Sequence, residues 1–178
     1  MKIRKNLSLR ADYLMNNPEI DAVFGLTRYI NRKGQVRKIR GENLNKIEMA
    51  LKFLKANTET PFCGMSFMYH AGVFKKVGVF DETNFRSEGG EFILRLLLSH
   101  CKIGFMDTPV YNYISLSRSC FKLFKPTICQ YRNKLQVIKK YTSGWQRYSL
   151  YIGNTLFLPV RVLHKMFYFS KSKQPKKK

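Results

Sequence analysis

The sequence is short of acidic residues and has none after Asp107. Of its 178 residues, 33 are Lys or Arg and only 11 are Asp or Glu, so the formal net charge is +22. Residues 1–107 carry 18 basic and 11 acidic side chains, a net charge of +7. Residues 108–178 carry 15 basic side chains and no acidic one, a net charge of +15. This second part favours an anionic partner, either lipid head groups or nucleic-acid phosphates.

The usual signatures of cofactor and metal sites are also missing. The sequence contains neither GxGxxG nor GxxxxGK[ST] and no Asp-x-Asp pair, so it indicates no nucleotide-binding turn and no metal–diphosphate site. Its four cysteines have no CxxC or Cys/His spacing, and neither His70 nor His100 has a second ligand at metal-binding spacing. The basic start, Met1 to Lys5, lacks the apolar segment of a secretion signal. We therefore expect reduced thiols, a cytoplasmic location and no metal site in these residues.

No apolar run is long enough to span a bilayer. Leu150 to Val160 falls well short of the roughly 20 residues that a spanning helix needs, and Arg161 and Lys165 follow it. Aromatic side chains accompany this run, and several basic ones follow it. Two interpretations stay open: a helix lying peripherally at the inner face of the membrane, or a helix packed on the core and followed by a basic tail. Nucleic-acid binding is not expected, because the aromatic residues follow core periodicity rather than forming a basic stacking platform.

The residues that are present suffice for one folded domain. A hydrophobic content of 44% and an aromatic content of 14% exclude a disordered chain. Hydrophobic periodicity and turn residues predict the following elements: a helix over 6–16 capped by Asn6 or Ser8, a strand over 20–26 that 27–30 can extend, a strand over 35–39, a helix over 43–57, a strand over 62–69, a short helix ending at Gly78, a helix ending at His100, strands over 103–106 and 110–114, and a helix from Pro126 that stops at Gly144.

This order predicts an α/β fold, a mixed sheet flanked by helices. We expect residues 1–144 to form this domain, residues 145–170 to form an amphipathic helical extension, and residues 171–178 to be a disordered basic tail.

Two carboxylates open the helix that ends at His100. Glu88 and Glu91 are three residues apart, so they share a face of that helix. Carboxylates at such a turn can act as an active-site base, but the dipole of the helix also favours acidic residues in its first turn. Arg95 is expected to pair with a nearby carboxylate, with Glu88 as the candidate.

The run from Leu14 to about Tyr141 resembles the C-terminal half of the family 2 glycosyltransferases, which have the GT-A fold. The strongest match is to a strand and helix beside the acceptor site, and the next is to the Glu-Asp motif with an arginine seven residues after its Glu. The matching segments, in the order that the family has them, are Tyr13–Val23, Tyr29–Gly34, Cys63–Glu82, Ser87–Leu96, Pro109–Tyr113 and Ser115–Ser117.

The resemblance implies roles for particular residues. Cys63, Gly64, Met65 and Asp81 fall on the acceptor side, so they are candidates for binding a saccharide acceptor.

The Asp of the Glu-Asp motif falls on Gly89. In inverting members of the family that Asp takes the proton of the acceptor hydroxyl, and glycine cannot. General-base catalysis is typically worth roughly 10²–10⁴-fold in rate. Glu88 or Glu91 could replace it only after a shift of the backbone, and they stand as the catalytic candidates.

The family binds its nucleotide sugar and divalent cation with a first half to which no part of residues 1–178 corresponds. We therefore expect a truncated or split glycosyltransferase, inactive alone, that belongs to surface polysaccharide assembly. The alternative is a non-catalytic relic that binds a carbohydrate or a partner at the membrane surface. Half of a sheet exposes an edge and an apolar face, so a complementary N-terminal half or a second copy is the expected protein partner.

Overall fold

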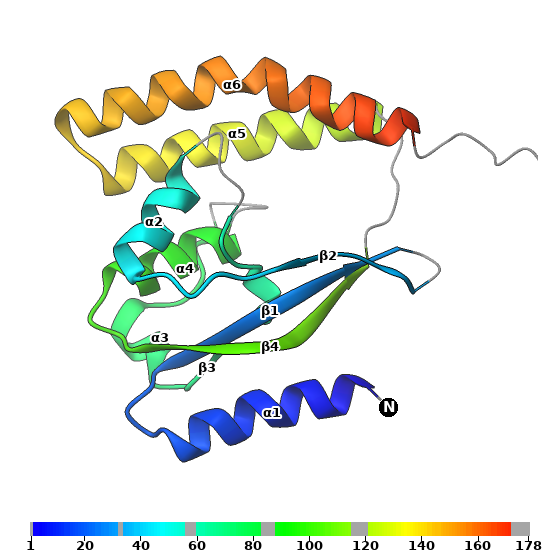
Figure 1. The fold of residues 1–178 in the computed structure, drawn as a ribbon. Coiled ribbons are helices and arrows are strands. Elements are labelled where there is room, and N and C mark those ends of the chain that lie inside the picture. Colours follow the sequence, from blue (N-terminus) through cyan, green and yellow to red (C-terminus); the bar gives the residue numbers. More distant parts are fainter. Residues whose placement is uncertain (1, 32–33, 56–59, 83–87, 115–120, 172–178) are drawn as a thin grey trace, which may run out of the picture.

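The fold of residues 2–31, 34–55, 60–82, 88–114 and 121–171 is described by a computed structural model, shown in Figure 1. It is an α/β structure with one mixed sheet between helices. The elements are α1 (Lys2–Asn16), β1 (Ala22–Ile30), β2 (Val36–Arg40), α2 (Lys46–Leu54), the 3-10 helix η1 (Gly64–Ser66), β3 (Met68–Tyr69), α3 (Val73–Val77), α4 (Glu88–Leu98), β4 (Ile103–Ile114), α5 (Phe121–Tyr141) and α6 (Gly144–Lys171).

The central strand of the sheet is β1. It pairs antiparallel with β2 and β3 and parallel with β4, along the whole length from Ala22 opposite Ile103 to Ile30 opposite Ile114. Apolar residues dominate β1, and its first four residues are buried, as a strand covered on both faces requires.

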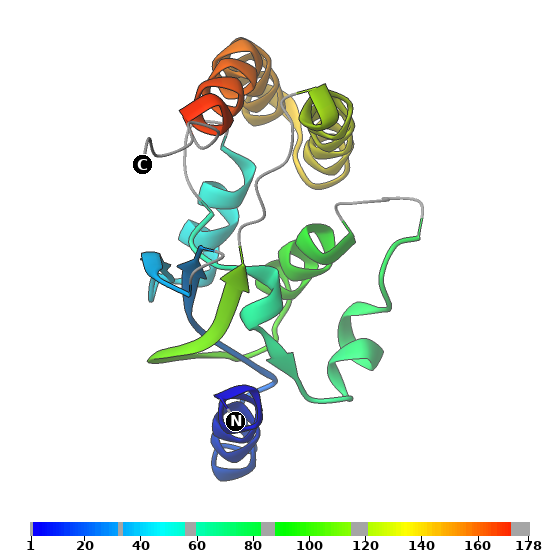
Figure 2. The same cartoon turned by 90° about the vertical axis from the view of Figure 1, so that its right-hand side faces the viewer.

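Helices cover both faces of this sheet. Figures 1 and 2 show α1 on one side and α2 and α4 on the other, with the α5–α6 hairpin beyond them. The α1 helix approaches β4 closely at Gly104, where an added Cβ would lie 2.6 Å from the ring of Tyr13. The core between the sheet and α4 is aromatic: the rings of Phe24 and Phe67 stack at 4.8 Å, and Tyr69 meets Phe92 edge-on at 5.3 Å.

The predicted strand over 62–69 is wrong for most of its length. Only Met68 and Tyr69 are a strand, and Gly64 to Ser66 form η1. The physical reason is local hydrogen bonding. The hydroxyl and the amide of Ser66 both donate to the carbonyl of Cys63, at 2.7 and 2.8 Å, which closes a turn instead of a ladder.

The two predicted strands over 103–106 and 110–114 are one strand. Pro109 lacks an N–H, which favours a break, but β4 passes through it with a shift of register against Leu26 and Thr27 of β1. The residues Asp107 and Thr108, at this irregularity, are exposed.

The stop predicted at Gly144 for the helix from Pro126 is confirmed, because α5 ends at Tyr141. Gly144 has a φ of 51°, and after the short connection from α5 it also begins α6. The α5 helix begins at Phe121, five residues before Pro126, and α1 begins at Lys2, before either predicted cap. Residues 145–170, predicted to be a helical extension, lie within α6, so their helical structure is confirmed. The predicted tail, 171–178, lies outside the described residues except for Lys171. None of the helices in the described part of the chain has the length and apolarity to cross a membrane.

Candidate functional site

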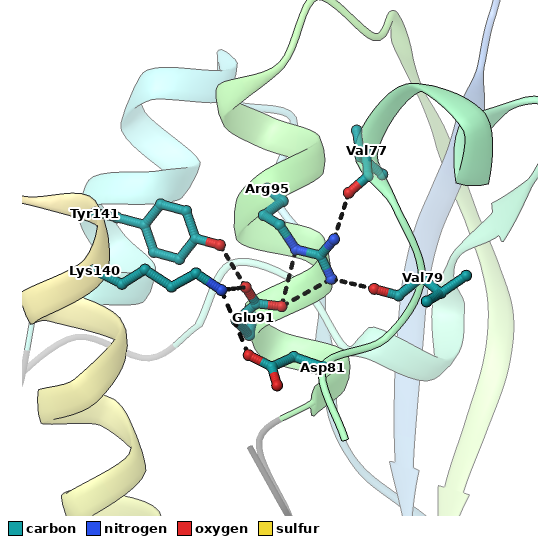
Figure 3. A network of polar contacts seen from close by, with 7 residues as sticks. All are labelled: Val77, Val79, Asp81, Glu91, Arg95, Lys140 and Tyr141. Atoms are coloured by element: carbon teal, nitrogen blue, oxygen red, sulfur yellow. Dashed lines mark hydrogen bonds and ion pairs between the residues drawn. The ribbon is translucent and has the colours of Figure 1, made fainter. Parts of the chain in front are cut away.

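The centre of the site is Glu91, in the first turn of α4. Its side chain is fully buried, with 0% of its surface exposed, although it is a carboxylate. A buried charge of this kind requires partners, because removal from water is costly. Figure 3 shows that donors from α4 and α5 surround both of its oxygens.

Arg95 supplies the first of these partners. Its Nε and Nη2 each lie 3.0 Å from Oε2 of Glu91, one helical turn away. The expected pairing of Arg95 with a nearby carboxylate is therefore confirmed, but that carboxylate is Glu91 and not the candidate Glu88. The same guanidinium donates to the carbonyl of Val77 and, at 2.6 Å, to that of Val79.

These two carbonyls flank Gly78, which has a φ of 78° and ends α3. A Cβ at Gly78 would lie 3.2 Å from Nη1 of Arg95, so glycine serves both the turn and the close approach of the guanidinium. Arg95 thus fixes the segment that leads to Asp81.

The other partners of Glu91 come from the C-terminal end of α5. The hydroxyl of Tyr141 donates to Oε1 of Glu91, and Nζ of Lys140 lies 3.1 Å from the same oxygen. The Lys140 ammonium also lies 3.4 Å from Oδ2 of Asp81, so it bridges the two carboxylates. Neither Lys140 nor Tyr141 could be predicted as a partner of Glu91, because Glu91 lies about 50 residues away and no local pattern of the sequence connects them.

These contacts set the protonation of Glu91. Burial alone would raise its pKa, but the hydrogen bonds from Tyr141, Lys140 and Arg95 outweigh burial and hold the pKa of Glu91 below its ordinary value. Burial, followed by the hydrogen bond to Glu91, raises the pKa of Tyr141 to about 12. The hydrogen bond to Glu91 likewise raises the pKa of Lys140.

An ionised carboxylate held by three donors suits an anchor between α4 and α5 better than a base that must release and take up a proton. Glu88, the first residue of α4, is exposed to solvent, whereas Glu91 in the same helix is buried. The catalytic assignment of both residues stays a prediction.

The predicted acceptor-side residues Cys63, Gly64 and Met65 lie together at η1. Met65 is 67% exposed, and Gly64 packs on α4, where its Cβ position is 3.4 Å from Cδ1 of Ile93. The backbone from Met65 to Phe67 is held by Arg10, a residue that is only 5% exposed and that the sequence did not mark.

Nη1 of Arg10 lies 3.4, 3.1 and 3.3 Å from the carbonyl oxygens of Met65, Ser66 and Phe67. Burial lowers the pKa of Arg10, and the three carbonyl oxygens accept hydrogen bonds from its buried guanidinium. The guanidinium therefore stabilises the backbone conformation of η1.

Gly89 and Gly90 differ in their surroundings. A Cβ at Gly89 would meet no atom of the described residues within 4 Å, whereas a Cβ at Gly90 would lie 2.9 Å from the ring of Phe53. Packing against Phe53 therefore disfavours a side chain at 90, whereas the described residues leave room for one at 89.

No three His, Cys, Asp or Glu side chains gather as a metal site within the described ranges. Near the motif, Asp81 and Glu91 face the ammonium of Lys140, and a divalent cation would have to displace it. These residues do not fit the metal–diphosphate site that the resemblance associates with a sugar nucleotide.

A scan of the chain against models of protein families finds no match, and a search of curated proteins finds none either.

Proposed function

We propose that residues 1–178 form the acceptor-side half of a family 2-like glycosyltransferase, with a partial GT-A-like sheet, that binds a saccharide or lipid-linked acceptor in surface polysaccharide assembly. The observation that carries the proposal is the physical connection between its two best-matching segments, 63–82 and 87–96. Arg95, the arginine of the motif, binds the carbonyls of Val77 and Val79, and Gly64 packs on Ile93.

In this proposal the acceptor surface is rigid before the ligand arrives. Arg10 fixes the backbone of η1, and Arg95 fixes the segment before Asp81. Exposed Met65 offers an apolar contact to a sugar face, and the partly exposed carboxylate of Asp81 can accept hydrogen bonds from sugar hydroxyls. Sugar transfer itself requires a segment that binds the nucleotide sugar and a divalent cation, and a complementary half would supply it.

Saccharide binding is the direct test. The purified chain is applied to an array of neutral and acidic oligosaccharides, and the affinity for any bound saccharide is measured by calorimetry. Met65→Ala should weaken binding, because it removes an exposed contact from η1. Met15→Ala is the matched control, since Met15 is 68% exposed and lies at the end of α1. Equal affinities for both variants, or no binding by the wild type, would contradict the proposal.

The second candidate is a binding relic without catalysis, and Gly89 favours it. An added Cβ would meet none of the residues that the structure describes, so packing against them does not account for the absence of the motif's Asp. The discriminating assay measures release of nucleoside diphosphate from nucleotide sugars by the wild type and by Gly89→Asp, each with and without a candidate complementary half. Transfer that requires Gly89→Asp supports the relic; transfer by the wild type with that half supports the split enzyme.

A further inference from the structure

The outer face of α6 carries a continuous row of exposed apolar side chains. Trp145 is 85% exposed and Leu156 is 68% exposed, values that are high for large apolar residues in a helix that packs on a core. The row advances by three or four residues at each step, which keeps it on one side of the helix. Its members are Trp145, Tyr148, Ile152, Leu156, Val160 and Leu163, each more than half exposed.

The opposite side of α6 already has its partners. Asn154 is 1% exposed and donates to the carbonyl of Leu54 at 3.0 Å, and Leu150 and Tyr151 pack against the core. The α6 helix lies at the periphery of the molecule, on the far side of the sheet from α1 (Figures 1 and 2). Within the described part of the chain, the row of exposed side chains is therefore a second apolar face that points away from the core.

The charge of the C-terminal part of the chain indicates which kind of partner binds this face. Residues 108–178 contain 15 Lys or Arg and no Asp or Glu, and α6 lies within this segment. A second copy would bring two such segments together, and their repulsion opposes that contact. An anionic lipid surface instead combines attraction for the basic residues with an apolar layer for the row. Trp145 and Tyr148, at the first turns of α6, are residue types that prefer the membrane interface.

We propose that the outer face of α6 binds the surface of an anionic lipid bilayer, with the helix lying in the plane of the head groups. The row enters the boundary of the acyl chains, and the basic residues of the C-terminal part meet the lipid phosphates. This binding is independent of the proposed saccharide site, because η1 and Asp81 contribute nothing to it.

The chain carries its own reporter. Trp145 is the single tryptophan of the chain and belongs to the row, so its fluorescence reports directly whether the row is inserted into the bilayer. The full chain is mixed with vesicles of phosphatidylcholine alone or of phosphatidylcholine with phosphatidylglycerol, and partitioning is measured by flotation. The expected result is a blue shift of Trp145 emission, quenching by lipids brominated in the acyl chain, and flotation with anionic vesicles that exceeds flotation with neutral ones.

The matched variants are Ile152→Ser with Leu156→Ser, and Ile47→Ser with Met15→Ser as the control. All four residues are exposed, so neither pair empties the core, and circular dichroism checks the fold. Burial of one large aliphatic side chain is worth roughly a factor of ten or more in partitioning, so the α6 pair should weaken vesicle binding by on the order of 100-fold. The control pair should leave it unchanged.

Three results would overturn the proposal. The first is absence of binding by the wild type to anionic vesicles. The second is equal binding by the α6 variant, with no blue shift, which would show attraction by charge alone. The third is a wild-type dimer in sedimentation velocity that the α6 variant converts to a monomer without any vesicle binding by either, which would make the occupant a second copy.

Discussion

The contribution of each partner of Glu91 to the free energy of unfolding depends on how exposed that partner is. Lys140 is 52% exposed, and ion pairs at exposed sites contribute at most about 1 kcal/mol. The hydroxyl of Tyr141 donates to a charged group that is itself buried, and such hydrogen bonds contribute about 1.5–3 kcal/mol. Tyr141→Phe should therefore lower the free energy of unfolding, measured with urea, by more than Lys140→Met does. The reverse order would show that the ammonium is the principal partner.

The lowered pKa of Glu91 makes stability depend on pH. Because its folded-state pKa lies below its unfolded-state value, the stabilisation is fully present above the unfolded pKa and is lost as pH falls through the folded pKa. Asp21, whose pKa is also lowered against the effect of burial by hydrogen bonds from Lys76 and the amide of Lys102, acts in the same direction.

At pH values below the ordinary pKa of a glutamate, the melting temperature of Glu91→Gln should therefore fall less steeply on acidification than that of the wild type. A decrease as steep as that of the wild type would mean that Glu91 is not ionised in the folded protein.

Gly89 and Gly90 form a matched pair of sites in one helical turn. Gly89→Ala should be neutral or should stabilise by up to about 1 kcal/mol, because alanine favours a helix more than glycine does. Gly90→Ala should destabilise by about 1–3 kcal/mol, because its Cβ would lie 2.9 Å from the ring of Phe53. Thermal unfolding of the two variants checks the difference. Equal losses would contradict the open space at residue 89.

The spacing of residues in the sequence was enough to identify Glu91 as the partner of Arg95. Glu91 and Arg95 are four residues apart, the distance at which helical side chains meet, whereas Glu88 lies seven residues away on an exposed turn. The contacts to Lys140, Tyr141 and Asp81 could not be predicted, because they depend on how α5 packs on α4 and the segment after α3.

At the scale of elements, the end of α2 depends on α6. The side-chain amide of Asn154 donates to the carbonyl of Leu54, the last residue of α2, at 3.0 Å, and so satisfies a carbonyl that the helix leaves unpaired. Asn154→Ala should destabilise by about 1–3 kcal/mol, because the buried carbonyl loses its donor. Hydrogen exchange should show faster opening of α2 in this variant. Unchanged protection of α2 would indicate that water replaces the amide.

Helices with clear periodicity were well predicted, and the errors arose where local hydrogen bonds override a pattern. The strands β1 and β2 and the helices α2, α3 and α4 are present where periodicity and turn residues placed them, within a few residues at the ends. The apolar run over 62–69 has the composition of a strand, but Ser66 and Arg10 turn part of it into η1. Pro109 is accommodated in β4 by an irregular register that no single-strand pattern reveals.

At the scale of the whole molecule, the sequence predicted the class of the fold, and the mixed sheet between helices confirms it. The antiparallel packing of α5 on α6 beyond α2 and α4 was not predicted, because it depends on contacts between helices that no local pattern of the sequence reveals. The exposed face of α6, the acceptor-side surface and the need for a complementary half are separate proposals, and each has a test that does not depend on the others.

The central claim is that η1 and the segment ending at Asp81 form a saccharide surface. Its most direct test is a two-dimensional NMR titration of the isotope-labelled chain with the tightest saccharide from the array. We expect the amide shifts of Cys63 to Ser66 and of Val77 to Asp81 to change, and we expect Met65→Ala to reduce these changes. Shift changes confined to α6 or α1, or none at all at saturating saccharide, would contradict it.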